Sequence, residues 1–410
     1  MNNGCLLAGI GYHAAMTFSA APTMLADTAD PLSLAIFCKV VDNYGDIGIC
    51  WRLARQLVAE HGVDVTLWVD ELTSFRKLCP EIDPQAEVQC VAGVTVRHWR
   101  GQDGVFAAAD IADIVIEFFA VDIPPGYVAA MAQCTPRPVW LNLEGLTAES
   151  WVEGCHTLPS MHPRLPLTKH FFFPGFTGKT GGLLREAGLD VQRRSFQSSP
   201  AAMAAFLASL GVTAPEMASL KVSLFCYPQA PVASLFEAWQ HGAEAITCLV
   251  PEGVAHLAVQ TFLGMPALPG AVATRGALTV RVLPFVPQPD YDRLLWACAL
   301  NFVRGEDSFV RAQWAGRPFV WHIYPQDAAL HHVKLRAFLA RYADGVAGLD
   351  QISLCWNEAA PDRPCAWSEL WQALRSEMPA IGLRAEAWQC RMDALGELAG
   401  NLLKFAAGKR

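Results

Sequence analysis

The feature that most constrains the fold is a series of short, nearly continuous apolar segments that alternate with helical patterns. The first, at residues 34–41, lacks the apolar–polar alternation of a half-exposed strand and is typical of a strand buried on both faces. Similar segments lie at 63–69, 94–99, 114–119 and 139–143. Most intervals between them are long enough for a crossover connection, so the pattern predicts an α/β fold with a parallel sheet.

This pattern weakens at residues 191–215 and then begins again, which predicts a second α/β half. Its expected strands are 220–227, 245–250, 278–285, 300–303 and 319–323, and its expected helices are 232–241, 291–299, 309–315 and 328–342. A last helical pattern runs from 385 to 405. Two such halves leave a cleft between them, and ligands of parallel sheets bind beyond the carboxyl ends of the strands.

Composition excludes several classes of protein. Hydrophobic residues make up 52% of the 410 residues and the net charge is −8, so the chain can bury large cores and lacks the basic surface of a general nucleic-acid binder. Its 13 cysteines are scattered without a C-x-x-C pair, which favours buried, reduced thiols. With no charged leader and no membrane-length apolar run, we expect a cytoplasmic protein without a membrane partner, preceded by a loose tail over residues 1–32.

One candidate site follows the first expected strand, where Asp42 and Asp46 flank a turn that contains Gly45 and opens a helix at about Ile47. The segment lacks the G-x-G-x-x-G pattern of dinucleotide-binding turns. A carboxylate at a helix N-terminus is favoured as the anion, so Asp46 is expected to be permanently ionised and able to hold or deprotonate a cationic acceptor. Simple helix capping is an equally good interpretation of these two acids.

A second candidate is the glycine-rich segment 173–182, which contains Gly178-Lys179-Thr180. A P-loop needs a glycine five residues before Gly178, and position 173 is Phe, so we reject that interpretation. A flexible loop facing the cleft and an ordinary surface loop both remain open.

Two further segments sit between an expected strand and an expected helix. In the first, Phe285 offers a ring for stacking on a base and Gln288 offers paired donor and acceptor groups for a pyrimidine edge, although such a segment is more often a plain strand end. In the second, residues 304–311, a glycine turn precedes a helix that starts at Asp307 and Ser308. Its free N–H groups and the Ser308 hydroxyl could hold a diphosphate, or these two residues could only cap the helix.

Taken together, segments 36–48, 173–183 and 304–326 closely resemble the bacterial protein-arginine rhamnosyltransferases that modify elongation factor P, the EarP family. The resemblance runs from about Leu34 to the C-terminus, and only the tail has no counterpart. It implies the GT-B glycosyltransferase architecture, in which two Rossmann-like domains face each other across a cleft. The expected domains are 33–215 on the acceptor side, joined by the last helix at about 392–410, and 216–391 on the donor side.

The resemblance also implies the reaction and the residues that carry it. Rhamnose would move from dTDP-β-L-rhamnose to an arginine of elongation factor P, with inversion and without a metal or other cofactor, and the product would help ribosomes through polyproline stretches. Asp46 resembles the catalytic base, Asp42 an assisting acid and Glu306 a glutamate needed near the donor. The residues implied around the donor are Phe225, Tyr227, Phe285, Gln288, Arg304, Gly305, Asp307 and Ser308, and those on the acceptor side are Asn43, Tyr44 and Gly45.

Two alternatives to this function remain from the sequence. One is a GT-B transferase with another nucleotide sugar or another acceptor. The other is a non-catalytic protein that binds a nucleotide sugar or a partner, against which the acids at 42, 46 and 306 argue. A transfer assay with different donors separates these possibilities, because only an enzyme turns its donor over.

Overall fold

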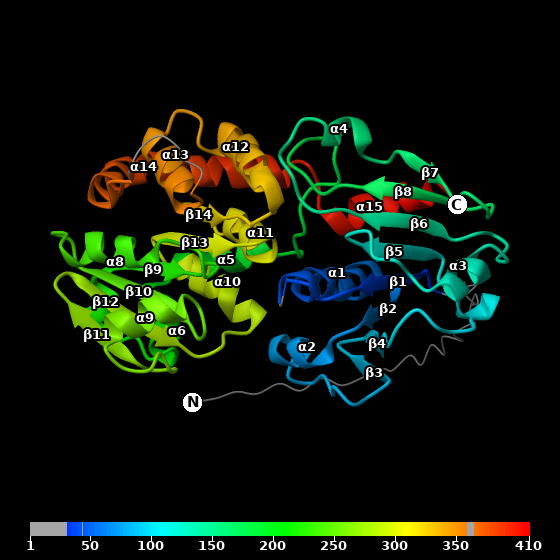
Figure 1. Cartoon of the computed structure of the whole chain (residues 1–410), viewed down its shortest axis with the longest axis horizontal. Coiled ribbons are helices and arrows are strands. Elements are labelled where there is room, and N and C mark those ends of the chain that lie inside the picture. The colour runs from blue at the N-terminus through cyan, green and yellow to red at the C-terminus, as the bar shows by residue number, and fades with distance from the viewer. Residues whose placement is uncertain (1–30, 43, 359–364) are drawn as a thin grey trace, which may run out of the picture. The chain divides into compact units, whose positions relative to one another are not determined.

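The first half of the chain forms a mainly parallel sheet of eight strands, in the order β3-β4-β2-β1-β5-β6-β8-β7 (Figure 1). Among these strands, β3 and β7 at the two edges run antiparallel to their neighbours. The strands are β1 (Ser33–Cys38), β2 (Asp64–Val69), β3 (Val88–Val91), β4 (Val94–His98), β5 (Ile114–Phe118), β6 (Val139–Leu143), β7 (Pro159–Met161) and β8 (Thr168–Phe172). The five buried strands expected here are all present, and the sequence pattern missed β3, β7 and β8.

The computed structural model describes residues 31–42, 44–358 and 365–410. Most of the expected tail and Asn43 therefore lie outside the described residues. The helical elements of the first half are α1 (Gly45–His61), α2 (Leu72–Leu78), the 3-10 turn η1 (Ala108–Asp110), α3 (Pro125–Met131) and α4 (Val152–Cys155). Helix α1 buries Leu53 and Leu57 against the sheet and ends at Gly62, whose φ of 63° suits a residue without Cβ.

The second sheet has six strands in the order β11-β12-β10-β9-β13-β14 and is parallel except for the pair β11–β12. Its strands are β9 (Leu220–Leu224), β10 (Ile246–Pro251), β11 (Val272–Arg275), β12 (Leu278–Leu283), β13 (Leu300–Arg304) and β14 (Phe319–His322). Alternate residues of β10 and β12 point into different cores: Cys248 and Val282 into a large one, Leu249 and Leu283 into a smaller one. Both faces are therefore covered, as the continuous apolar segments predict.

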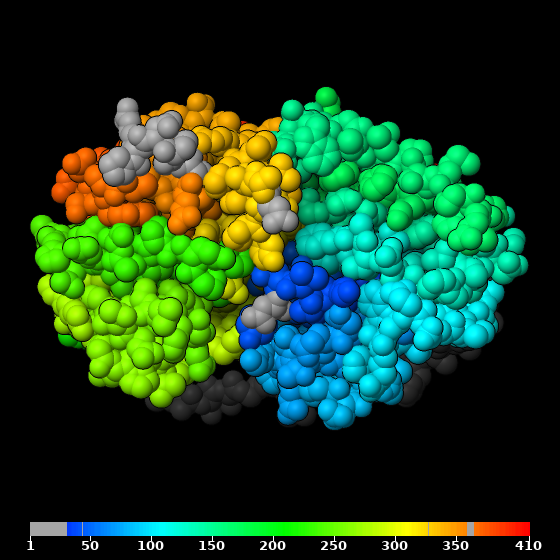
Figure 2. Space-filling model, viewed as in Figure 1, coloured from blue at the N-terminus to red at the C-terminus, as the bar shows by residue number. Residues whose placement is uncertain are grey.

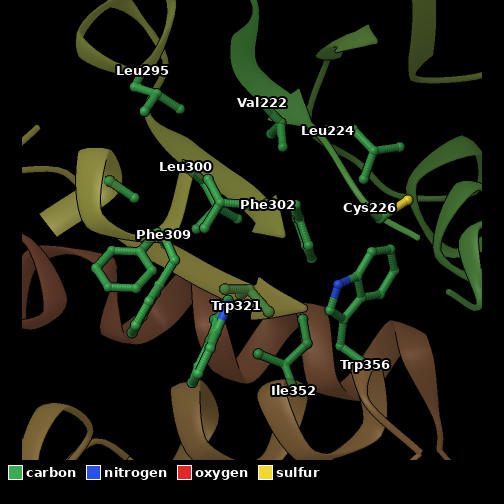
Figure 3. Packing of buried hydrophobic residues seen from close by; sticks show 14 of the residues in the cluster. Val222, Leu224, Cys226, Leu295, Leu300, Phe302, Phe309, Trp321, Ile352 and Trp356 are labelled. Carbon is green, nitrogen blue, oxygen red and sulfur yellow. The ribbon is translucent and has the colours of Figure 1, made fainter. Parts of the chain in front are cut away.

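Helices cover both faces of this second sheet. They are α5 (Leu189–Gln197), α6 (Pro200–Ser209), α7 (Ala214–Ala218), α8 (Val232–Gln240), α9 (His256–Leu263), α10 (Gln288–Ala297), α11 (Asp307–Trp314), the 3-10 turn η2 (Asp327–Ala329), α12 (Leu330–Tyr342), α13 (Ala347–Trp356) and α14 (Trp367–Asp393). Figure 3 shows the larger core, in which Phe302 and Trp321 of the strands pack near Ile352 and Trp356 of α13.

Helices α5 and α6 pack with the second sheet rather than the first. Phe196 of α5 lies against Trp296 of α10, and Leu207 of α6 belongs to the same small core as Leu249 and Leu294. The change from one half to the other therefore falls before Leu189 in the packing, earlier than the boundary near residue 215 that we expected from the sequence.

The C-terminal segment is two helices instead of the single helix predicted over 385–405. Helix α14 ends at Asp393, Gly396 turns the chain with a φ of 79°, and α15 (Leu398–Ala407) begins after Glu397, whose carboxylate accepts hydrogen bonds from the backbone N–H groups of residues 399 and 400. Leu398 and Leu402 of α15 pack into the core of the first sheet. The chain thus returns to its first half through α15.

The expectation of reduced cysteines needs one correction. Cys355 at the end of α13 and Cys365 before α14 form a disulfide, with Cα atoms 6.0 Å apart. The two cysteines are 10 residues apart and form no C-x-x-C pair, so sequence spacing does not reveal this bond. Other cysteines, such as Cys38, Cys50 and Cys248, are buried free thiols as expected.

Candidate active site

The turn between β1 and α1 holds two acids in different surroundings. Asp46 is buried, and its Oδ2 accepts hydrogen bonds from the backbone N–H groups of Val41 and Asp42, both at 2.7 Å. A Cβ at Gly45 would lie 2.9 Å from Asp42 Oδ2, so a larger residue there would displace the Asp42 carboxylate. The carboxylates of Asp42 and Asp46 are thereby held on the same cavity wall.

The structure corrects the sequence interpretation of Asp46 in two respects. The N-cap of α1 is Tyr44, and Asp46 lies in the first turn of the helix itself. Its side chain accepts hydrogen bonds from the preceding loop instead of capping the helix. Burial raises the pKa of Asp46 above its ordinary value, although its two hydrogen bonds oppose this rise. Burial thus works against the permanently ionised state that we expected. A raised pKa lies closer to the pKa of an effective general base at neutral pH.

The turn between β13 and α11 meets the first turn at Gly305. A Cβ at Gly305 would lie 2.7 Å from the Tyr227 hydroxyl and 3.1 Å from Asp42 Oδ2, and its φ is 59°. Tyr227, which follows β9, donates a hydrogen bond to Asp42 Oδ2 at 2.7 Å. Two turns from different sheets therefore touch through a glycine and a tyrosine hydroxyl.

Glu306 reaches from the second half to the first. It is the N-cap residue of α11, and its Oε2 accepts a hydrogen bond from the backbone N–H of Leu146 at 3.0 Å. Burial raises the pKa of Glu306 to about 7, although the Leu146 N–H and the charge of Lys334 oppose the rise. This side chain can therefore change its protonation state near neutral pH.

Two cavities meet at these turns, and Figure 2 shows the surface at the junction of the halves. The larger, of about 410 Å³, is lined by the acids of both turns, by Glu144 and Phe119 of the first half, and by Lys334 of α12. The smaller, of about 110 Å³, lies on the side of the second sheet. Both are lined by Asp42, Gly45, Gly305 and Glu306, so the two cavities adjoin.

The smaller cavity brings together most of the residues that the resemblance places around the donor. They are Phe225, Phe285, Gln288, Arg304, Gly305, Asp307 and Ser308, and Tyr44 and Gly45 line it too. The guanidinium of Arg304 lies 4.4 Å from the ring centroid of Phe225 and 4.8 Å from that of Tyr227, and it donates to the carbonyl of Cys226. This arrangement fixes a cation at the wall of the cavity.

Some of these polar groups are engaged by the protein itself. The Gln288 side chain donates to the Gly48 carbonyl at 3.1 Å and accepts from Arg55 at 3.3 Å, so it bridges the two halves. The Ser308 hydroxyl bonds the backbone of Arg304, donating to its carbonyl and accepting from its N–H. A ligand that uses either group must therefore replace or share these bonds.

The glycine-rich loop 173–182 lines neither of the two cavities. The Lys179 side chain is 74% exposed and pairs with Glu153 at 3.3 Å. Phe176 is buried against Phe309 and Phe338 of the second half. The loop thus connects the halves, and seven of its ten residues are buried, with only Gly178 and Lys179 exposed. Neither a flexible loop facing the cleft nor an ordinary surface loop describes it.

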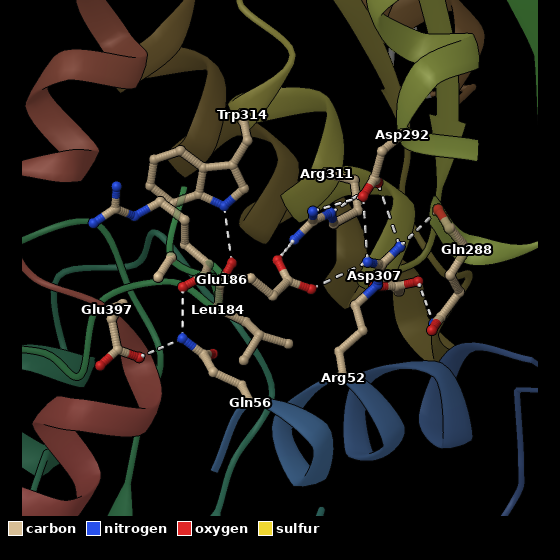
Figure 4. Close-up of polar contacts among 12 residues, drawn as sticks. Arg52, Gln56, Leu184, Glu186, Gln288, Asp292, Asp307, Arg311, Trp314 and Glu397 are labelled. Carbon is tan, nitrogen blue, oxygen red and sulfur yellow. Dashed lines mark hydrogen bonds and ion pairs between the residues drawn. The ribbon is translucent and has the colours of Figure 1, made fainter. Parts of the chain in front are cut away.

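A buried ion network behind the site joins α1 to α10 and α11 (Figure 4). Arg52 of α1 pairs with Asp307 at 3.0 Å and with Asp292 at 3.4 Å, while Arg311 of α11 pairs with Asp292 at 2.7 Å and with Glu186 at 2.6 Å. Burial would raise the pKa of Glu186, but the two arginines lower it to about 2. Charge pairing thus holds the helices behind both turns together.

Sequence reasoning missed three residues that line the larger cavity: Glu144, Phe119 and Lys334. Glu144 follows the expected strand at 139–143 directly, so the rule that ligands bind beyond strand ends could have found it. Phe119 ends the expected strand at 114–119, so the same rule applies to it. Lys334 carries no sequence signal of this kind, because only the folded chain brings its helix to the cavity.

Two kinds of feature are absent from the described ranges 31–42, 44–358 and 365–410. These ranges contain no group of three or more histidine, cysteine or acidic side chains arranged to hold a metal ion. They also contain no helix with both the length and the apolar character needed to cross a membrane.

Comparison with known proteins covers most of the chain. A family model described as "Elongation-Factor P (EF-P) rhamnosyltransferase EarP" matches residues 34–407. The protein-arginine rhamnosyltransferase of Pseudomonas putida is 49% identical over 371 residues, which cover 90% of this chain and 97% of that protein. The one from Pseudomonas aeruginosa is 47% identical over 378 residues, which cover 91% and 98%.

A solved structure gives the same result for the fold. It is described as "Structural basis for EarP-mediated arginine glycosylation of translation elongation factor EF-P", is 36% identical and superposes with a TM-score of 0.62. The match covers 92% of this chain and 99% of that one. Two Rossmann-like halves facing across a cleft constitute the GT-B architecture, which this chain shares. The chain therefore belongs to the EarP family of arginine rhamnosyltransferases and is an enzyme.

Proposed function

We propose that this enzyme transfers rhamnose from dTDP-β-L-rhamnose to an arginine side chain of elongation factor P. The observation that carries the proposal is the pair of adjoining cavities. The first is lined by four carboxylates, and the second combines aromatic rings and Arg304 with four carboxylates, two of which it shares with the first. The first suits a cationic acceptor, and the second suits a base and a diphosphate. The modified acceptor would support translation of polyproline stretches.

Asp46 is the proposed catalytic base. A guanidinium has a pKa of about 13.8, so it is a poor nucleophile until it gives up a proton. A buried carboxylate with a raised pKa can take that proton as the new N–C bond forms. Asp42 would assist by orienting the acceptor cation, because its Oδ2 is itself oriented by Tyr227.

The proposed transfer proceeds with inversion at the sugar carbon. The attacking nitrogen then approaches from the side opposite the leaving diphosphate, so base and donor must lie on opposite walls of the cleft. Asp46 belongs to the first half, and the proposed donor residues belong to the second half. Phe225, Phe285 and Gln288 would hold the thymidine, with Tyr227 beside them.

The leaving diphosphate would be stabilised by protein groups without a metal ion or other cofactor. The N-terminal N–H groups of α11, near Asp307 and Ser308, and the Arg304 guanidinium are the proposed donors. Glu306 would act close to the reacting sugar, because it lines both cavities. Asn43, Tyr44 and Gly45 are proposed to contact the acceptor, with Gly45 lining both cavities and Tyr44 reaching the acceptor from the rim of the smaller one.

Intact-mass spectrometry of the acceptor tests this function. Purified enzyme is incubated with elongation factor P and dTDP-rhamnose in the presence of EDTA, and a gain of one deoxyhexose is the expected result. An unmodified acceptor with donor binding still detectable would favour a different acceptor. Loss of both transfer and donor binding would favour a different nucleotide sugar, which is the alternative function.

A further inference from the structure

Glu144 is a carboxylate of the larger cavity to which the family resemblance gives no role. It follows β6 and lines the same cavity as Asp42, Asp46 and Glu306. The next two residues of the chain lie close to Glu306. Leu146 donates its backbone N–H to Glu306 Oε2 at 3.0 Å, and a Cβ on Gly145 would lie 3.5 Å from the same oxygen. Glu144 is therefore adjacent to the glutamate that spans the two halves.

A buried amide fixes the Glu144 side chain. Asn142, which is 1% exposed, donates a hydrogen bond from Nδ2 to Glu144 Oε1 at 2.6 Å. The Oδ1 atom of the same amide accepts from the backbone N–H of Ala120 at 3.0 Å. One buried side chain thus positions both the carboxylate and the turn that follows β5.

This turn carries Phe119 to the cavity wall in an unusual backbone conformation. Phe119 and Ala120 have φ values of 56° and 53°, in the left-handed region that non-glycine residues seldom adopt. The Phe119 ring lies beside Gly145, at 3.5 Å from the position of a Cβ there. Strained conformations of this kind persist where the surrounding structure holds them, and they concentrate at functional sites.

The side chains that line the larger cavity favour a cationic ligand, because acidic groups outnumber basic ones. Four carboxylates and one ammonium group, that of Lys334, line it. Burial raises the pKa of Glu144 above its ordinary value, although the Asn142 hydrogen bond and the charge of Lys334 on α12 oppose the rise. Among the described side chains, none forms an ion pair with Glu144 at salt-bridge distance. A planar guanidinium with five N–H donors matches such a site, and it can also stack on an aromatic ring.

The other acids, like Glu144, each accept a hydrogen bond from the protein, and each of them already has a proposed task. Asp46 Oδ2 accepts two backbone N–H groups, Asp42 Oδ2 accepts from Tyr227, and Glu306 Oε2 accepts from Leu146. A base that removes one proton also requires that the remaining N–H groups of the acceptor be held by another group.

We propose that Glu144 binds the guanidinium of the acceptor arginine in the ground state, with Phe119 forming the face on which the guanidinium stacks. Asn142 is the positioning residue for both. This inference rests on the proposed function, since it assumes an arginine acceptor in this cavity. It assigns acceptor binding to Glu144 and proton removal to Asp46.

Steady-state kinetics of Glu144→Gln test the inference. Gln keeps the length of the side chain and an oxygen for the Asn142 bond, so the variant should fold. We expect the KM for elongation factor P to rise at least tenfold, while the KM for dTDP-rhamnose stays within twofold and kcat within threefold. Titration calorimetry of the acceptor without donor should show the same loss of affinity.

Two variants serve as controls. Glu149→Gln removes the same charge five residues away, where the carboxylate accepts a hydrogen bond from Thr147, and should leave all constants unchanged. Glu144→Asp keeps the charge and should recover part of the acceptor affinity, which a purely structural role would not require.

The outcomes separate the inference from the function on which it rests. Normal transfer by the wild-type enzyme, together with an unchanged acceptor KM in Glu144→Gln, would overturn the inference alone. A fall in kcat with unchanged acceptor affinity would overturn it as well, because Glu144 would then act in the transition state. Absence of transfer by the wild-type enzyme would overturn the proposed function and the inference with it.

Discussion

The two turns at the site are built alike but place their acids in different environments. Each follows a parallel strand, contains a glycine and opens a helix, α1 in the first half and α11 in the second. In the first turn, Asp46 accepts two backbone N–H groups from its own loop. In the second, Glu306 accepts one N–H from the opposite half. The comparison suggests that the first turn holds its acid independently, whereas the second depends on how the halves meet.

The largest expected effect on transfer comes from substitution of Asp46 at the first turn. Asp46→Asn keeps an oxygen that can accept the two N–H groups but removes the base, so transfer should fall about a thousandfold while folding and donor binding persist. Single-turnover assays with elongation factor P measure this loss. Asp64→Asn, on the exposed start of β2, is the control. Activity of Asp46→Asn within tenfold of the wild type would contradict the base assignment.

The helices behind the two turns share one buried ion network. Substitution of Arg311, on α11 behind the second turn, removes part of this network. Arg311→Met leaves Asp292 and Glu186 with fewer partners in a buried place, so the free energy of unfolding should fall by about 3–5 kcal/mol. Urea denaturation measures this change. Arg100→Met, which breaks an exposed pair with Glu87, should have no measurable effect. Equal stability of the two variants would show that the network does not hold the halves together.

The protonation of Glu306 sharpens the comparison through pH. Its pKa in the folded protein is about 7 against an ordinary 4.5, so the folded state holds this proton to higher pH than the unfolded chain. Its contribution to stability is therefore complete below pH 4.5 and is lost as the pH rises through 7.

The Glu306→Gln variant has a neutral amide at this position, which does not titrate in this pH range. Between pH 4.5 and pH 8 the unfolding free energy of the wild type should fall relative to that of the variant, by up to roughly 3 kcal/mol. Urea denaturation of both proteins across this range gives the difference. Curves that stay parallel would mean that Glu306 titrates normally, as an exposed glutamate does.

The smallest expected effect comes from the contact between the turns. Tyr227→Phe removes the hydrogen bond to Asp42 Oδ2, which is worth roughly 1–2 kcal/mol because the acceptor is charged, so kcat should fall about tenfold. Steady-state transfer assays measure it. Tyr127→Phe, in the separate aromatic core behind the first sheet, is the control. An unchanged kcat would mean that Asp42 needs no orientation from the second half.

Much of the fold was predictable because buried parallel strands leave a continuous apolar signal. Five strands of each sheet were expected, with ends within a few residues. They are β1, β2, β4, β5 and β6 in the first sheet and β9, β10, β12, β13 and β14 in the second. Four strands were missed because they are short and partly exposed, so they carry no such signal: β3, β7, β8 and β11. The break between α14 and α15 was missed because the apolar pattern continues in leucines across the turn.

The candidate site divides in the same way. Asp42, Asp46 and Glu306 were found because each lies in a turn directly after an expected strand. Glu144 could have been found by the same rule. The surroundings of these acids could not, since burial, the Leu146 N–H and the Tyr227 hydroxyl all come from segments more than a hundred residues away.

The amino-acid sequence by itself determined the order of strands and helices and the acids that follow the strands, because periodicity and turn chemistry are local properties. Only the tertiary structure decided which acids face each other, which of them lose contact with water, and that Cys355 meets Cys365. The reason is physical: electrostatic environment and reactivity depend on distance and burial, and these arise when remote parts of the chain pack together.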